Sequence, residues 1–227
     1  PRGRVPTLPP SALLPTEEAP PYVTPPLEET VCVGERLPGE TDDTAAIQRA
    51  LDSGKGTVYL RNDRVYFISD TVVIRGKVRQ LVGMGAEINL GGNGARFSDS
   101  RSPYPLIRID QTESDTVILE NLFLNAQYPG EVLFENNTSS TVVIRHCSGW
   151  VGSEGHRQAY RNTAQARGKL WVEDVFLPGW NFTGQTVWAV QFNPENWDGD
   201  GTEPQVVNDG GKLSILGFKT EGPAPFL

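Results

Sequence analysis

Residues 39–60 read GETDDTAAIQRALDSGKGTVYL, and the order of patterns within this stretch decides the fold class. Thr41 and Asp42 are candidate N-caps, because their side-chain oxygens can accept hydrogen bonds from the free N–H groups at a helix start. Gly54 and Gly56 are helix stop signals. The stretch therefore predicts one amphipathic helix of about three turns, followed at once by a strand. Its apolar face, at helical spacing, consists of Ala46, Ile47, Ala50 and Leu51.

Short runs rich in β-branched and aromatic residues fill the rest of the chain, with Gly, Asn, Asp and Ser between them. No second amphipathic helix pattern follows, which argues against alternating βαβ units. The chain is therefore predicted to be all-β after its single helix. The expected strands are Thr57–Leu60, Val65–Ile68, Thr71–Ile74, Val78–Val82, Glu87–Leu90, Leu106–Ile109, Thr116–Leu119, Leu122–Leu124, Val132–Phe134, Thr141–Arg145, Leu170–Val175, Val187–Phe192 and Leu213–Phe218.

Similar phrases recur within these runs: DTVILEN at 115–121, STVVIRH at 140–146 and KLWVEDV at 169–175. They lie roughly 25–30 residues apart, a spacing typical of stacked structural repeats. Asn121 and Asn125 stand beside strands, where corners need residues that tolerate a left-handed backbone or form stacked amides. A sandwich built from hairpins is the alternative, and the repeat favours a solenoid.

The opening phrase, with GTVYL at 56–60 and YFISDTVVIRG at 66–76, resembles the start of the pectate-lyase-like right-handed parallel β-helix superfamily. TVWAVQFNPE at 186–195 and NDGGKLSILGFKTEG at 208–222 are similar to a branch related to the double-β-helix β-1,3-glucanases. The resemblance covers about residues 35–222. It implies an all-β fold, a single-stranded right-handed parallel β-helix (solenoid) with an N-terminal capping α-helix.

The same resemblance implies an extracellular or cell-surface protein that acts on or binds a polysaccharide. One reading is a β-glucanase-like glycoside hydrolase, or half of one. The other is a non-catalytic carbohydrate-binding, spike-like or structural assembly subunit. Because the active groove of the double-solenoid relatives lies between two solenoids, the resemblance also implies another chain or fragment that completes the solenoid.

Composition divides the chain into two parts. Residues 1–34 are rich in Pro and lack apolar periodicity, so they are predicted to form an extended arm or linker. Residues 35–227 are expected to form the β-helix domain, as part of a larger solenoid protein. The net charge of −8 argues against nucleic-acid partners and disfavours anionic polysaccharides. With this charge, a neutral polysaccharide is the expected partner. No apolar run is long enough for a membrane span.

Glycoside hydrolysis usually needs two carboxyl groups that face each other across the substrate. Glu173 and Asp174 are the predicted catalytic pair, because tryptophans lie near them in the sequence. Trp171, Trp180 and Trp188 are the predicted substrate-binding residues, since indole faces stack on the apolar faces of sugar rings. Glu120 and Glu135 are further candidate carboxylates at or near strand ends.

Metal and thiol chemistry have little support in the sequence. The acidic loop at residues 198–201 lacks the remaining ligands of a calcium loop, so neither a metal nor a cofactor is predicted. His156 lies in a polar loop and is expected to be structural or solvated. Cys32 and Cys147 could form one disulfide if the chain before the first strands ran down the outside of the fold. Two separate buried thiols are the other reading.

Overall fold

The computed structural model describes residues 17–91, 95–125, 127–150, 158–195, 202–222 and 224–227. Within these residues the strands form two sheets, sheet A with nine strands and sheet B with six. Sheet A comprises β1 (Thr30–Cys32), β2 (Thr57–Tyr59), β3 (Val65–Ile68), β5 (Gln80–Leu90), β7 (Thr116–Asn125), β9 (Thr141–Arg145), β11 (Leu170–Phe176), β13 (Val187–Asn193) and β15 (Leu213–Phe218). Sheet B comprises β4 (Val72–Gly76), β6 (Tyr104–Thr112), β8 (Glu131–Asn136), β10 (Gln158–Asn162), β12 (Trp180–Thr183) and β14 (Val206–Asp209).

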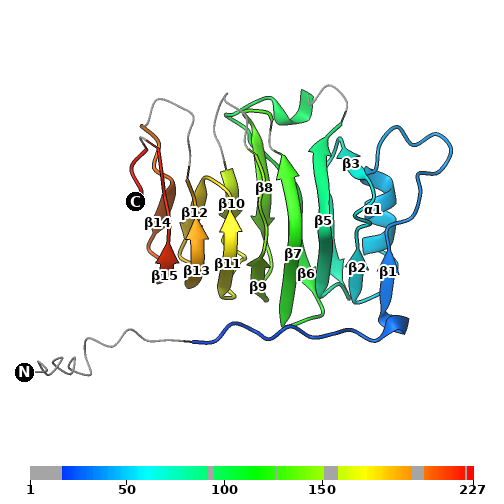
Figure 1. Ribbon diagram of the computed structural model, residues 1–227, viewed down its shortest axis with the longest axis horizontal. Coiled ribbons are helices and arrows are strands. Elements are labelled where there is room, and N and C mark those ends of the chain that lie inside the picture. Colours follow the sequence, from blue (N-terminus) through cyan, green and yellow to red (C-terminus); the bar gives the residue numbers. More distant parts are fainter. Residues whose placement is uncertain (1–16, 92–94, 126, 151–157, 196–201, 223) are drawn as a thin grey trace, which may run out of the picture.

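Consecutive strands from β4 to β15 alternate between the two sheets, so neighbours within a sheet are two strands apart in the chain. Every pairing within the described residues is parallel. Figure 1 shows the strands standing side by side in one long stack. The repeated phrases occupy β7, β9 and β11, which are direct neighbours in sheet A. The expectation of an all-β protein with stacked parallel strands is therefore confirmed.

The core lies between the sheets and follows from the period-two alternation of strand side chains. In sheet B, one row of residues in register points inward and is fully buried; its members are Ile107, Phe134, Tyr160, Trp180 and Val206. The next residue along each of β6, β8 and β10 is charged and faces outward, and these residues are Arg108, Glu135 and Arg161. Apolar side chains thus fill the interior while charged side chains pair on the surface.

The helix α1 spans Thr44–Leu51 and lies at the β1 end of the stack (Figure 1). Its predicted apolar face is buried as expected. The helix is shorter than predicted and begins three residues after Thr41. The reason lies in Asp43, whose carboxylate binds Arg36 at 2.7 Å and the backbone N–H of Phe67 at 2.8 Å. Asp42 provides the capping contact, accepting a hydrogen bond from the N–H of Thr44 at 2.8 Å.

Several strand boundaries differ from the sequence prediction. β10, β12 and β14 had no predicted counterpart, and β5 and β7 each join two predicted strands into one. β1 falls inside the predicted arm, and the short 3₁₀ turn η2 (Leu27–Glu29) precedes it; a second such turn, η3, spans Ala95–Phe97. Before η2, residues 17–26 run in an extended path along one side of the stack (Figure 1).

Candidate functional site

A column of left-handed residues forms one corner of sheet A. Asn121, His146, Asp174 and Gln191 have φ values of 54°, 52°, 49° and 51°. The residues just before them pair in register across β7, β9, β11 and β13. The chain therefore turns at the same level in each successive strand. The prediction for Asn121 is confirmed, and Asn125 forms a stacked amide contact with Asn89 at 2.7 Å.

A pocket of about 280 Å³ lies along this corner. His146 Nδ1 and Asp174 Oδ2 lie 3.1 Å apart in it, with their side chains 51% and 71% exposed. The pocket thus offers an imidazole, a carboxylate and amides, all of which can exchange hydrogen bonds with hydroxyl groups. Its full lining consists of His146, Cys147, Ser148, Asp174, Val175, Phe176, Gln191 and Asn193.

An exposed aromatic side chain stands next to this pocket. Trp150 is 66% exposed, and its ring meets Phe176 of the pocket lining edge to face, with centroids 6.1 Å apart. The preceding residue, Gly149, lies close against β7, because a Cβ at Gly149 would lie 1.7 Å from the carbonyl oxygen of Leu124. The backbone N–H of Trp150 also donates to Asn125 Oδ1 at 3.3 Å. The surface here therefore joins an exposed aromatic ring to polar side chains that can form hydrogen bonds.

The two carboxylates of the predicted catalytic pair make separate contacts. The Asp174 carboxylate contacts His146, whereas the Glu173 carboxylate lies on the outer face of sheet A, 3.9 Å from Nε of Arg145. Glu120 approaches the same Nε at 3.8 Å from the opposite side. Asp174 stands in the left-handed column at the strand end, one residue after Glu173. The remaining candidate, Glu135, is buried and paired with Arg108 and Arg161 on sheet B.

The three predicted substrate-binding tryptophans are all buried. Trp180 is 0% exposed and stacks on Tyr160 in the core, so the prediction that it binds substrate is wrong for this structure. Trp180 and Phe182 are two residues apart in β12, so both rings point into the core. Trp171 and Trp188 stack on each other on the outer face of sheet A, with centroids 5.5 Å apart, and Ala19 packs against them. Their exposed fractions are only 3% and 5%.

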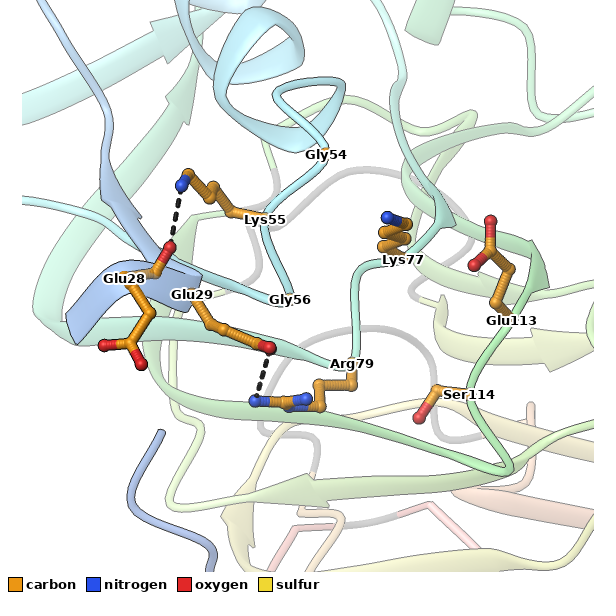
Figure 2. Close-up of a pocket in the computed structure, with 9 residues that line it drawn as sticks. All are labelled: Glu28, Glu29, Gly54, Lys55, Gly56, Lys77, Arg79, Glu113 and Ser114. Carbon is orange, nitrogen blue, oxygen red and sulfur yellow. Dashed lines mark hydrogen bonds and ion pairs between the residues drawn. The ribbon is translucent and has the colours of Figure 1, made fainter. Parts of the chain in front are cut away.

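A second pocket, of about 440 Å³, lies where η2 meets the sheets (Figure 2). Lys55 Nζ donates to the backbone carbonyl of Glu28 at 2.7 Å, and Arg79 pairs with Glu29 at 3.0 Å. Figure 2 shows that both cations reach toward η2. Three cations and three carboxylates balance one another in its lining, which is Glu28, Glu29, Gly54, Lys55, Gly56, Lys77, Arg79, Glu113 and Ser114. We therefore read this pocket as the point where residues 17–29 are fastened to the sheets.

Both cysteines are free thiols. Cys147 is buried, as predicted, and burial raises the pKa of its thiol to about 12, which leaves it unreactive. Cys32 is exposed on β1, contrary to the expectation of two buried thiols. Within the described part of the chain, no three His, Cys, Asp or Glu side chains gather as metal ligands. The acidic loop at 198–201 and His156 lie outside the described residues.

Comparison with protein-family models, with curated proteins and with solved structures found no match for the chain in any of the three. None of the helices in the described segments is long and apolar enough to cross a membrane.

Proposed function

We propose that the chain is a right-handed parallel β-helix that binds a neutral polysaccharide outside the cell. The alternation of strands between two parallel sheets supports a solenoid, because each return to a sheet adds one strand beside the last. Crossovers between parallel strands are right-handed in about 98% of cases, which gives the proposed hand. The resemblance of the opening phrases to pectate-lyase-like proteins supports the extracellular assignment.

The exposed Trp150 beside the corner pocket is the observation that carries this proposal. A sugar ring stacked on the indole face would place its hydroxyl groups near the pocket that Phe176 shares with His146 and Asp174. Such a site needs no free charge, because hydroxyl groups bind to amide, imidazole and carboxylate groups alike. The net charge of −8 repels acidic polymers, so the bound polymer is assigned as neutral.

A glycoside hydrolase is the second candidate, favoured by the exposed Asp174 carboxylate and its contact with His146. Asp174 could serve as one of the two carboxyl groups of such an enzyme. Glu173 and Glu120 are less suited to this role, since both flank the guanidinium of Arg145. The test is the release of reducing sugar from neutral glucans. Loss of this release in Asp174→Asn, with binding retained, would decide for the hydrolase.

Replacing Trp150 with alanine tests the binding site directly. We expect Trp150→Ala to weaken the binding of soluble neutral gluco-oligosaccharides by about 30-fold, since an aromatic residue central to a binding site contributes about 2 kcal/mol. Isothermal titration calorimetry on the full chain measures this change. Phe67→Ala is the matched control, because Phe67 is also an exposed aromatic residue, on β3 away from the corner pocket. Equal affinities for the two variants and the unaltered chain would contradict the proposal.

A further inference from the structure

A row of half-buried side chains runs along the stack beside the left-handed column of sheet A. Each member of the row lies two residues after a member of the column. Parallel bridges join Phe123 to Ser148 and Ser148 to Phe176, and Phe176 pairs in register with Asn193. The residue that precedes each member is buried in the core, so period-two alternation turns the row outward. We call these four residues the track.

Polar side chains border the track on both sides. On one side stands the column, whose residues are all exposed, so that each track residue has a polar side chain two positions earlier in the chain. On the other side lie Asn125 and Trp150, two positions after Phe123 and Ser148. The ring of Trp150 packs edge to face against Phe176 of the track. The surface therefore combines aromatic rings with hydrogen-bonding groups along both edges.

The series of polar column residues ends on the strands at either side. On β5 the left-handed positions are Met84 and Gly85, neither of which carries a polar side chain. On β15 the position next to Gln191 in register is Gly217, which is also left-handed and has no side chain. Among the described residues, polar side chains thus accompany the track at four successive levels, those of β7, β9, β11 and β13.

The spacing of the track matches that of an extended sugar chain. The strands stand side by side (Figure 1), about 4.8 Å apart, which is close to the length of one ring in an extended β-1,4-linked glucan. Phe123 and Phe176 are two strands apart, or about 10 Å. A β-1,4-linked chain repeats its orientation at every second ring, so both phenyl rings would meet the same apolar sugar face. Its hydroxyl groups project from the edges, toward the polar side chains.

We propose that the track binds an extended β-1,4-linked glucan lengthwise along the stack, with one sugar ring beside each of its four residues. The corner pocket already contains Ser148, Phe176 and Asn193, and Phe123 extends it by one further ring position. The exposed carboxylate of Asp174 disfavours acidic sugars at this surface. This inference rests on the proposed binding of a neutral polysaccharide. It adds the orientation of the polymer, its linkage and the number of rings bound.

The test compares β-1,4-linked glucose oligosaccharides of two, four and six rings by isothermal titration calorimetry on the full chain. We expect the tetrasaccharide to bind about tenfold more tightly than the disaccharide, because the disaccharide is too short to reach both Phe123 and Phe176. The hexasaccharide should bind within about twofold of the tetrasaccharide, since the polar column ends at β7 and β13. A β-1,3-linked tetrasaccharide should lack the tenfold gain, because its chain curls away from a straight row.

Two substitutions at Phe123 separate the aromatic ring from its contribution to folding. Phe123→Leu keeps an apolar side chain of similar size without a flat ring, so it should remove the tenfold gain and leave the affinity for the disaccharide unchanged. Phe123→Tyr keeps the ring and should keep the gain. Phe67→Ala is the control, because Phe67 is an exposed aromatic residue on β3, beyond the Met84 end of the column.

Equal affinities for the disaccharide and the tetrasaccharide would overturn the inference, and so would a gain that persists in Phe123→Leu. An equal gain for the β-1,3-linked sugars would overturn the assigned linkage. Trp150→Ala distinguishes the two proposals. If it weakens binding of the disaccharide while chain length has no effect, the corner site stands and the track fails. If neither sugar binds to the unaltered chain, the proposed function itself fails.

Discussion

Replacing Trp180 with alanine should destabilise the protein by about 4 kcal/mol, because large-to-small changes at buried Trp residues cost about 3–5 kcal/mol. Trp180 is fully buried and stacks on Tyr160 with ring centroids 5.7 Å apart. Phe192 packs edge to face against Trp180, with ring centroids 5.2 Å apart. The Nε1 of Trp180 donates a hydrogen bond to the carbonyl of Leu177 at 2.6 Å. The substitution leaves a cavity in the row of aromatic residues that joins the sheets, and it also leaves that carbonyl without its donor.

Urea unfolding of the unaltered chain and of Trp180→Ala measures the loss of stability. Trp150→Ala serves as the reference for removing a tryptophan, because Trp150 is exposed and its loss should change stability by less than about 0.5 kcal/mol. The two variants should therefore behave in opposite ways: one loses stability, and the other loses affinity for sugar. A stable Trp180→Ala protein with impaired sugar binding would restore the sequence-based assignment of Trp180 to the substrate site.

The sequence predicts sheet A well and sheet B only in part. Strands such as Thr141–Arg145 carry several β-branched residues, and their repeat marks them clearly. β10 has the sequence QAYRN, in which only Ala159 and Tyr160 are apolar, and β12 has WNFT, in which only Trp180 and Phe182 are apolar. Propensity is weak in such short segments, and their strands are stabilised by pairing with neighbours that a local pattern does not reveal. The missed strands therefore all depend on contacts between distant segments.

The candidate site was predicted less well than the fold, because residue type alone does not tell which face a side chain occupies. The sequence does not distinguish Trp180 from Trp171. Trp180 lies in the core, whereas Trp171 lies on the outer face of sheet A, where Ala19 packs against its cluster. Strand side chains alternate with period two, so counting from a buried Cys147 predicts that Ser148 and Trp150 point outward and Gly149 inward. This signal could have identified Trp150 as an exposed aromatic residue. The different contacts of Glu173 and Asp174 follow from the strand end at Asp174, whose left-handed backbone matches that of Asn121 in the same column.

A buried carboxyl group at the start of β8 makes stability depend on pH. Glu131 is 2% exposed, and its Oε2 accepts hydrogen bonds from the N–H groups of Gln127 and Tyr128 at 2.9 Å and 3.4 Å. Its Oε1 has no partner within the described part of the chain. Burial raises the pKa of Glu131 from 4.5 to about 7, because removal from water disfavours the charged form.

The folded protein therefore binds the Glu131 proton more tightly than the unfolded chain does. Stability from this group is complete below about pH 4.5, falls as the pH rises toward about 7, and stays low above that value. Glu131→Gln keeps the shape and an acceptor for the two N–H groups but cannot ionise. We expect Glu131→Gln to be about 3 kcal/mol more stable than the unaltered chain at about pH 8, with no difference at about pH 4.

Urea unfolding at both pH values measures this difference. Glu113→Gln is the matched control, because Glu113 is exposed and its replacement removes one carboxylate without relieving burial. A gain at high pH in both variants would point to the net charge of −8 as the cause. A gain confined to Glu131→Gln would assign the pH dependence to that buried group, whereas lower stability of Glu131→Gln at about pH 8 would show that the charged form is the stabilising one.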